Sequence, residues 1–354
     1  MSIDHLGWNA GLADAFAHEY GDALLPARVS LEHRGLYVVM MERGEFQAVA
    51  TGRLIYDAFD RADMPVVGDW VATRIVGESD PTVTIHGVLP RRNAICRKEP
   101  GRRTRPQPLA ANLDSLFLVI GLDGNFNLHR VERYLAVALD SGVQPVVLLT
   151  KADLREDVEA VVVETRARAR SAPVHAVSAL SGIGLEALTT YLGVGKTVAL
   201  LGSSGVGKST LLNRLIGEEV QRVQEVREFD SKGRHATTHR QMFRLPSGAL
   251  LIDTPGIREL QLWDAEDGVE EAFDDIEELA RSCRFSDCGH KHEPGCAVLE
   301  AIADGRLEQD RLDHYRKLRR ELAYEERKVN YRANLADRER WKRISKLSKN
   351  LKKR

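Results

Sequence analysis

The stretch that decides the fold is TVALLGSSGVGKSTLLNRLIG, residues 197–217 of a chain of 354 residues. An apolar run leads into a glycine-rich turn, and a helical pattern follows the turn. The turn matches G-x-x-x-x-G-K-[ST], the phosphate-binding loop, in the strand–loop–helix setting that this motif requires. Glycines let backbone N–H groups close around phosphate oxygens, and the helix N-terminus adds partial positive charge. A glycine-rich surface turn without a ligand is the alternative interpretation.

Two side chains of this loop carry chemistry. Lys208 is expected to reach the β- and γ-phosphates of a nucleotide, and the Ser209 hydroxyl is expected to bind Mg²⁺. The other loop residues are expected to surround the phosphates: Gly202, Ser203, Ser204, Gly205, Val206, Gly207 and Thr210. The loop alone does not choose the base or the reaction.

Apolar strand patterns alternate with helical patterns around this loop. Such alternation predicts a parallel sheet with helices on both faces. The expected strands are 115–120, 145–150, 174–177, 197–201 and 249–253, and the expected helices are 129–140, 156–170, 185–191 and 208–216. The sequence therefore predicts a central α/β domain over residues 108–268.

Two of the expected strands end in residues suited to read a purine base. Thr150-Lys151-Ala-Asp153 follows the strand VVLLT, and Ser178-Ala179 follows the strand VHAV. The Asp153 carboxylate can accept two hydrogen bonds from guanine, and adenine lacks that pair of donors. Lys151 would pack over the base, and a backbone N–H of the Ser178-Ala179 loop would support guanine O6. A surface turn is the alternative for these short patterns.

Asp253-Thr-Pro-Gly256 ends the last expected strand. Its carboxylate can hold Mg²⁺, and the Gly256 N–H can contact the γ-phosphate. Together the motifs resemble those of a translation-factor-type GTPase, but the base-reading motifs precede the phosphate loop. This order predicts a circularly permuted P-loop GTPase domain. Permutation is tolerated because the pocket depends on spatial neighbours and chain termini often lie close together.

The N-terminal third has a different character. Residues 1–25 are expected to be an amphipathic extension. Residues 26–107 hold short β-rich runs (36–41, 46–54, 69–75 and 82–89), which predict a small OB-like β-barrel, and then a basic linker from residue 91. Small barrels of this type often bind nucleic acid, which is an analogy of fold.

A cluster of cysteines and histidines indicates a metal site. Cys283, Cys288, His290 and Cys296 supply three thiolates and one imidazole, which fit a closed tetrahedral Zn²⁺ site of structural type. His292 is the alternative to His290, and a chance cluster of reduced cysteines is the alternative to a metal. A helical zinc-binding domain is therefore expected over residues 269–354.

The net charge of −1 conceals an uneven distribution. Residues 306–354 hold 18 Lys+Arg and 8 Asp+Glu, and Trp341 lies among nine basic side chains in 338–354. A basic helix suits rRNA phosphates, although a solvated, salt-bridged helix has the same composition. No apolar run could span a membrane and no secretory signal opens the sequence, so we expect a cytoplasmic protein without membrane contact.

The order of barrel, permuted GTPase and Cys/His region closely resembles the ribosome small subunit-dependent GTPase A family over roughly residues 26–310. Further matching stretches are Gly68–Val71, Leu109–Asp114 and Lys232–His239. The resemblance implies GTP hydrolysis stimulated by the small ribosomal subunit, in late maturation of that subunit and through rRNA binding. It also implies GTP or GDP, Mg²⁺ and one structural Zn²⁺ as ligands, and we expect a monomer.

The last of these stretches is the expected switch region. His235 is the candidate for positioning the attacking water, because Ile257 stands where many GTPases place a water-orienting glutamine. A loop histidine without a catalytic role is the alternative. Thr237 or Thr238 should supply the hydroxyl that meets Mg²⁺ and the γ-phosphate. Thr150 stands where asparagine is common, which predicts guanine specificity with weaker affinity.

Three other functions are compatible with parts of the sequence. A P-loop kinase or ATPase would explain the phosphate loop but not Asp153 or the Cys/His cluster. An RNA-binding protein with a vestigial nucleotide site would explain the basic stretches but not the complete set of phosphate and Mg²⁺ residues. A GTPase that acts on mature ribosomes as a translation factor differs from an assembly factor in its preference for mature over immature subunits.

Overall fold

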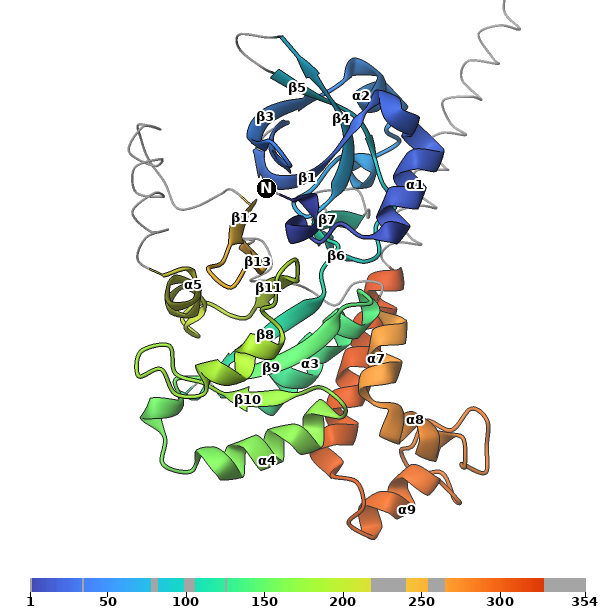
Figure 1. Cartoon of the computed structure of the whole chain (residues 1–354). Helices are drawn as coiled ribbons and strands as arrows, with labels where there is room; N and C mark the ends of the chain where they lie inside the picture. The colour runs from blue at the N-terminus through green and yellow to red at the C-terminus, as the bar shows by residue number, and fades with distance from the viewer. Residues whose placement is uncertain are drawn as a thin grey trace, which may run out of the picture. The chain divides into compact units, whose positions relative to one another are not determined.

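The computed structural model describes residues 2–33, 35–77, 82–98, 106–124, 126–217, 240–253 and 265–327. The chain divides into two compact units. The first unit spans Met1–Glu99 and Arg105–Gln261, and the second spans Pro100–Thr104 and Leu262–Arg354. Among the described residues, every strand belongs to the first unit, and the second unit is helical (Figure 1).

The first five strands close into a barrel (Figure 1). Their order is β1-β2-β3-β5-β4, β4 pairs back with β1, and β3 and β5 run parallel. This is the strand order of an OB barrel, which confirms the predicted class. Alternate side chains of these strands fill its interior, among them Val29, Val39, Val71, Val83 and Ile85. The strands are β1 (Leu25–His33), β2 (Leu36–Met41), β3 (Gly44–Ala50), β4 (Trp70–Val76) and β5 (Thr82–Val88).

Two parts of the barrel differ from the expected pattern. The sequence analysis did not predict β1, because a proline and charged residues interrupt its apolar alternation. The expected strand 46–54 ends at Ala50, since the Thr51 hydroxyl then accepts the Leu54 N–H and caps helix α2, Gly52–Asp57. A short 3₁₀ helix, η3 (Arg61–Asp63), leads toward β4.

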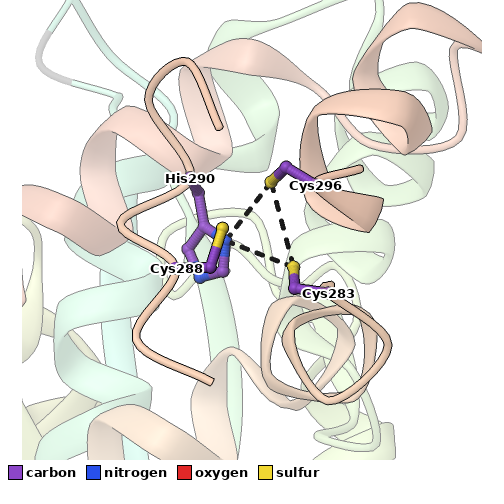
Figure 2. A group of neighbouring side chains, drawn as sticks. All are labelled: Cys283, Cys288, His290 and Cys296. Carbon is purple, nitrogen blue, oxygen red and sulfur yellow. Dashed lines mark hydrogen bonds between the residues drawn. The ribbon is translucent and has the colours of Figure 1, made fainter. Parts of the chain in front are cut away.

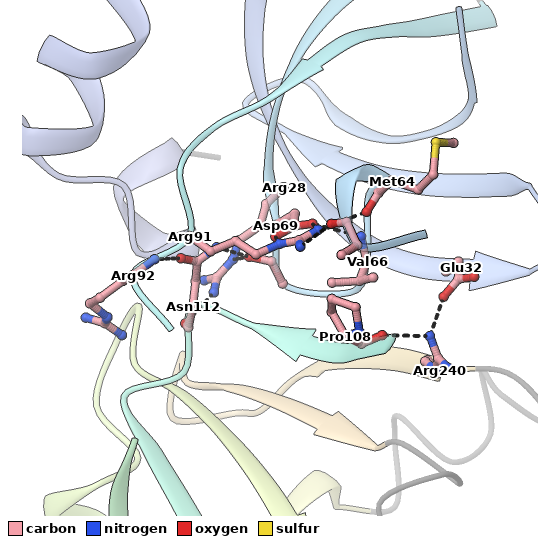
Figure 3. Close-up of polar contacts among 12 residues, drawn as sticks. Arg28, Glu32, Met64, Val66, Asp69, Arg91, Arg92, Pro108, Asn112 and Arg240 are labelled. Carbon is pink, nitrogen blue, oxygen red and sulfur yellow. Dashed lines mark hydrogen bonds and ion pairs between the residues drawn. The ribbon is translucent and has the colours of Figure 1, made fainter. Parts of the chain in front are cut away.

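Arg28 of β1 joins the N-terminal extension to the barrel (Figure 3). This guanidinium is 2% exposed, and it donates to the backbone carbonyls of Leu6, Gly68 and Asn112. Burial lowers the pKa of Arg28 to about 10, which still leaves it charged at neutral pH. The residues before β1 form η1 (Ile3–Leu6), α1 (Ala10–Tyr20) and η2 (Gly21–Ala23).

The expected basic linker contains a two-stranded sheet. Strand β6, Ala94–Lys98, pairs antiparallel with β7, Pro106–Ala111. Before β6, Arg91 makes two hydrogen bonds to the buried Asp69 carboxylate, at 2.8 and 2.7 Å. The basic residues here therefore serve partly to attach the segment to the barrel, which composition alone did not reveal.

The central sheet has the strand order β10-β9-β8-β11-β13-β12, with β12 antiparallel to β13 and the other pairs parallel. The strand that carries the phosphate loop, β11, lies beside β8, the first strand of the sheet in sequence. This order confirms the predicted permuted α/β domain. The strands are β8 (Ser115–Gly121), β9 (Gln144–Thr150), β10 (Val174–Ala176), β11 (Thr197–Leu201), β12 (Arg240–Arg244) and β13 (Leu250–Asp253).

Helices cover both faces of this sheet. On one face, α5 (Lys208–Ile216) and the 3₁₀ helix η5 (Leu185–Thr190) pack on Phe117 and Val119 of β8. A helix was expected at 185–191, and the structure has a 3₁₀ helix there that ends one residue earlier. On the other face, α3 (Leu128–Asp140) packs against α4 (Val158–Ala169) and a buried ion pair joins Glu132 to Arg168 at 2.9 Å.

The second unit packs three short helices against a longer one. The short helices are α7 (Glu266–Ala272), α8 (Asp274–Ala280) and α9 (Ala297–Ala303), and residues 309–327 form the longer helix. Arg311 of the longer helix pairs with Asp275 at 2.8 Å and lies over the Phe273 ring. The basic stretch 338–354 lies outside the described residues. No helix in the described part of the chain is long and apolar enough to cross a membrane.

Candidate nucleotide and metal sites

The strands of the central sheet bring the predicted nucleotide-binding loops to one edge. Gly121 of β8 lies beside Thr150 of β9, and Ala199 of β11 lies beside Ile252 of β13. The loops that follow these strands therefore leave the sheet together, at its carboxyl edge. Ligands of open α/β sheets bind at this edge, where the strand order reverses, and β8 and β11 are the neighbours at that point.

The phosphate-binding loop has the backbone geometry that its glycines predict. Gly205 and Gly207 have φ angles of +79° and +97°, in the left-handed region that other residues rarely adopt. Gly207 immediately precedes α5, so the first N–H groups of that helix are available to a ligand at the loop. The Lys208 ammonium folds over the loop and donates to the carbonyls of Gly202 and Ser203. Backbone donors and an ammonium in one small turn suit phosphate oxygens.

Thr150 and Lys151 attach the base-reading loop to the phosphate-binding loop. Thr150 is 3% exposed, and its hydroxyl donates to the Val206 carbonyl at 2.5 Å. Lys151 has a φ of +61°, and its ammonium donates to the Gly205 carbonyl and to the Asp123 carboxylate, each at 2.7 Å. The two loops therefore form one connected structure.

Two residues at this edge were missed by the sequence analysis. Asp123, the partner of Lys151, follows the carboxyl end of β8, just as the predicted site residues follow their own strands. Its position after an expected strand could therefore have marked it as a site residue. Arg130 of α3 donates to the Ser203 hydroxyl of the phosphate-binding loop at 3.2 Å. No sequence pattern predicted that contact, because it joins residues far apart in the chain.

The remaining predicted residues at this edge are placed as follows. Asp153 lies in a one-turn 3₁₀ helix, η4 (Ala152–Leu154), directly after β9. Ser178 is 1% exposed and donates its backbone N–H to the Ile183 carbonyl at 2.9 Å, and Ala179 comes next. Asp253 is the last residue of β13. Four predicted residues lie outside the described part of the chain: His235, Thr237, Thr238 and Gly256.

The second unit brings the predicted metal ligands together (Figure 2). The ligand atoms of Cys283, Cys288, His290 and Cys296 all lie within 4.8 Å of one another. The sulfurs of Cys283 and Cys296 are 3.9 Å apart, and His290 Nδ1 lies 3.6 and 3.5 Å from them. A tetrahedral zinc site with ordinary bond lengths has sulfur–sulfur edges of about 3.8 Å and sulfur–nitrogen edges of about 3.6 Å. The cluster therefore has the size and shape to hold such an ion.

Hydrogen bonds from backbone N–H groups to one carboxylate stabilise the loop between these ligands. The Glu293 carboxylate accepts hydrogen bonds from the N–H groups of His292, Lys291 and Gly289, which lower the pKa of Glu293 to about 2. His290 adopts a left-handed φ of +56° inside this loop. Desolvation lowers the pKa of the His290 imidazole, which favours the neutral form that binds metals.

Comparison with known families agrees with this architecture. The family model described as RsgA GTPase matches residues 88–263, which contain all the nucleotide-binding motifs. A model described as ABC transporter matches residues 185–352, a range that shares the phosphate-binding loop but lacks the base-reading motif at Thr150–Asp153. P-loop GTPases and ATPases share this loop, so the second match adds no separate fold.

Proteins of known name and structure match nearly the whole chain. The small ribosomal subunit biogenesis GTPase RsgA of Opitutus terrae is 49% identical over 97% of this chain and 96% of its own. The protein of the same name from Methanosarcina acetivorans is 44% identical over 96% and 90%. The crystal structure of YjeQ from Thermotoga maritima matches with a TM-score of 0.63, 27% identity and coverage of 85% and 99%. YloQ, a circularly permuted GTPase, matches with a TM-score of 0.60, 26% identity and coverage of 91% and 98%. The chain described here therefore belongs to the RsgA GTPase family.

Proposed function

We propose that this protein hydrolyses GTP to GDP and phosphate at the carboxyl edge of its central sheet, and that the small ribosomal subunit stimulates the reaction. One observation carries the proposal most directly. The Lys151 ammonium contacts both the phosphate-binding loop, through Gly205, and Asp123 beyond β8. That contact joins a loop suited to guanine with a loop suited to phosphate, as a guanine nucleotide requires. Comparing phosphate release from GTP and from ATP tests it.

The residues at this edge have separate roles in binding. Asp153 reads guanine through its N1–H and amino group, and Lys151 packs over the base. Because the Ser178 N–H is engaged with Ile183, Ala179 is the residue that supports guanine O6. The phosphate oxygens are bound by the backbone of the phosphate loop and by Lys208. The phosphate-loop residues are Gly202, Ser203, Ser204, Gly205, Val206, Gly207 and Thr210.

Hydrolysis requires Mg²⁺ and a positioned water. The hydroxyls of Ser209 and of Thr237 or Thr238, with the Asp253 carboxylate, would hold Mg²⁺, which would supply positive charge beside the phosphate oxygens. Gly256 contacts the γ-phosphate, and His235 orients the water. With Ile257 after the Gly256 motif in place of a glutamine, turnover by the protein alone is slow, and a partner accelerates it.

The partner is the small ribosomal subunit, in late maturation, with rRNA as the surface that is contacted. Support comes from the relatives, which are named for biogenesis of that subunit, from the OB barrel and from the basic stretch 338–354. We propose a cytoplasmic monomer. Its parts are an extension (1–25), the barrel and basic segment (26–107), the GTPase domain (108–268) and the zinc-binding helical domain (269–354).

Cys283, Cys288, His290 and Cys296 hold one structural Zn²⁺ in this proposal. Four protein ligands complete the tetrahedron, so the ion organises the loop between α8 and α9 instead of binding substrate. The bound ion would stabilise a loop in which several side chains add little apolar packing, since Arg281, Arg284, Phe285 and Asp287 are exposed.

Replacing Cys296 with serine is expected to remove bound zinc and to unfold the segment from α8 to α9. Zinc binding supplies on the order of 10 kcal/mol to small domains of this type, so its loss is comparable to the whole stability of an ordinary domain. Zinc content by atomic absorption and thermal unfolding by circular dichroism measure both effects. The matched control is Cys96→Ser, because Cys96 is partly buried in β6 and outside the cluster. Full zinc content in the Cys296 variant would refute this ligand assignment.

Replacing Thr150 with valine is expected to weaken GTP and GDP binding by about 5- to 150-fold, because the buried Val206 carbonyl loses the hydrogen-bond donor that fixes the loop, at a cost of about 1–3 kcal/mol. Equilibrium binding of fluorescent nucleotides measures the change. Thr150→Ser keeps the hydroxyl and is expected to bind almost normally. If valine binds as well as threonine, the hydroxyl does not organise the loop.

A further inference from the structure

The barrel and the central sheet meet along one strand. Strand β12 pairs with β13 on one side and with β1 of the barrel on the other. Gln241 is the register partner of both Leu31 in the barrel and Asp253, the proposed Mg²⁺ residue. A single row of three residues thus crosses from the barrel to the nucleotide site.

A shielded ion pair reinforces this junction (Figure 3). The Arg240 guanidinium lies 2.7 Å from one oxygen of Glu32 on β1, and the two side chains are only 12% and 13% exposed. Arg61 approaches the other Glu32 oxygen at 3.6 Å, and Arg240 also donates to the Pro108 carbonyl at 3.4 Å. Arg240 therefore contacts the barrel and the strand that leads into the central sheet.

Arg240 lies next to the expected switch region in the sequence, because it directly follows the stretch Lys232–His239. Strand β1 in turn pairs with β2 and β4, so it is the barrel strand through which a displacement of β12 would act. A buried ion pair contributes little net stability compared with apolar packing, so stability alone does not account for this pair. A cavity of about 150 Å³ borders the pair and is lined by Glu32 and Arg240 among other residues.

We propose that the Glu32–Arg240 pair is a positioning device that couples the nucleotide state of the central domain to the hold of the barrel on the small ribosomal subunit. The proposal rests on the function proposed above. Gln241 pairs with Asp253 at the proposed Mg²⁺ site and with Leu31 of β1, and the neighbouring Glu32–Arg240 pair transmits a change at that site to the barrel. Coupling between two binding sites is reciprocal, so subunit binding through the barrel also favours the GTP-bound arrangement.

The test compares affinities of the intact protein for purified small subunits in GDP and in a non-hydrolysable GTP analogue. The ratio of the two dissociation constants reports the coupling. Glu32→Gln and Arg240→Gln are each expected to reduce this ratio by about fivefold or more, the lower end of ordinary allosteric coupling. Nucleotide affinity without subunits is expected to stay within about twofold of wild type, since neither residue contacts the nucleotide loops in the described structure.

Two further variants separate coupling from general damage. Arg240→Lys keeps the charge and is expected to retain most of the wild-type ratio. Asp57→Asn neutralises an exposed barrel carboxylate that pairs with Arg53 at 3.4 Å, and is expected to leave the ratio unchanged. Circular dichroism identifies any variant that fails to fold. If one of the two glutamine variants does not fold, the other still removes the ion pair.

The outcomes distinguish this inference from the proposed function. A wild-type protein that binds small subunits in neither state contradicts the proposed function itself. A wild-type ratio of one overturns the coupling while leaving stimulated hydrolysis intact. Wild-type ratios in both glutamine variants, or an equal loss in Asp57→Asn, overturn the role of this pair.

Discussion

The Lys208→Ala variant is expected to hydrolyse GTP at least ~10²-fold more slowly than the wild-type protein. Removing one preorganised donor to a charged transition state costs about 10²–10³ in rate, and Lys208 carries a full charge as well. In the structure its ammonium donates to the carbonyls of Gly202 and Ser203, within the loop that would surround the phosphates. Single-turnover phosphate release at saturating GTP measures the loss in the chemical step.

A lysine at the opposite end of β11 provides the control. Lys196 immediately precedes β11, its side chain is 57% exposed and it pairs with Asp114 at the amino edge of the sheet. Lys196→Ala removes the same charge and is expected to leave turnover within about twofold, as for surface changes in general. Residual activity near wild type in Lys208→Ala would place the chemistry outside this loop.

The Asp153→Asn variant is expected to lose its preference for GTP over xanthosine triphosphate by about 10³-fold or more. The carboxylate accepts two hydrogen bonds from guanine. Xanthine replaces the amino group with an oxygen, to which the asparagine NH₂ can donate and a carboxylate cannot. Sites built around such hydrogen bonds reject analogues that lack them by about 10⁴–10⁵-fold. The ratio of kcat/KM for the two nucleotides measures the switch.

Asp157→Asn is the matched control for this base-reading assignment. Asp157 lies four positions further along, is 56% exposed and pairs with Arg155 at 2.6 Å. Its replacement is expected to leave nucleotide selectivity unchanged. Unaltered GTP selectivity in Asp153→Asn would show that another residue reads the base.

The features predicted from sequence are those that neighbouring residues specify. The phosphate loop requires two left-handed glycines and a following helix within ten residues or so, and buried parallel strands read as continuous apolar runs. The rotated order of the motifs predicted the permuted sheet, which the strand order confirms. The sequence likewise indicated the three cysteines with His290 or His292, and the structure brings His290 together with the cysteines.

The features that sequence did not predict depend on contacts between distant segments. Strand β1 was missed because Arg28 is polar and yet buried, where three backbone carbonyls from separate segments satisfy it. The pairing of β12 with β1 joins residues about 200 positions apart, and no local pattern encodes that register. Asp123 and Arg130 contact the nucleotide loops only once the sheet has formed.

The most direct test of the whole account is phosphate release from GTP by the purified protein, with and without purified small ribosomal subunits and with ATP as the control nucleotide. We expect slow turnover of GTP alone, a rise of at least ~10²-fold when small subunits are added, and little turnover of ATP under either condition. GTP turnover that is indifferent to small subunits, or faster turnover of ATP than of GTP, would contradict it.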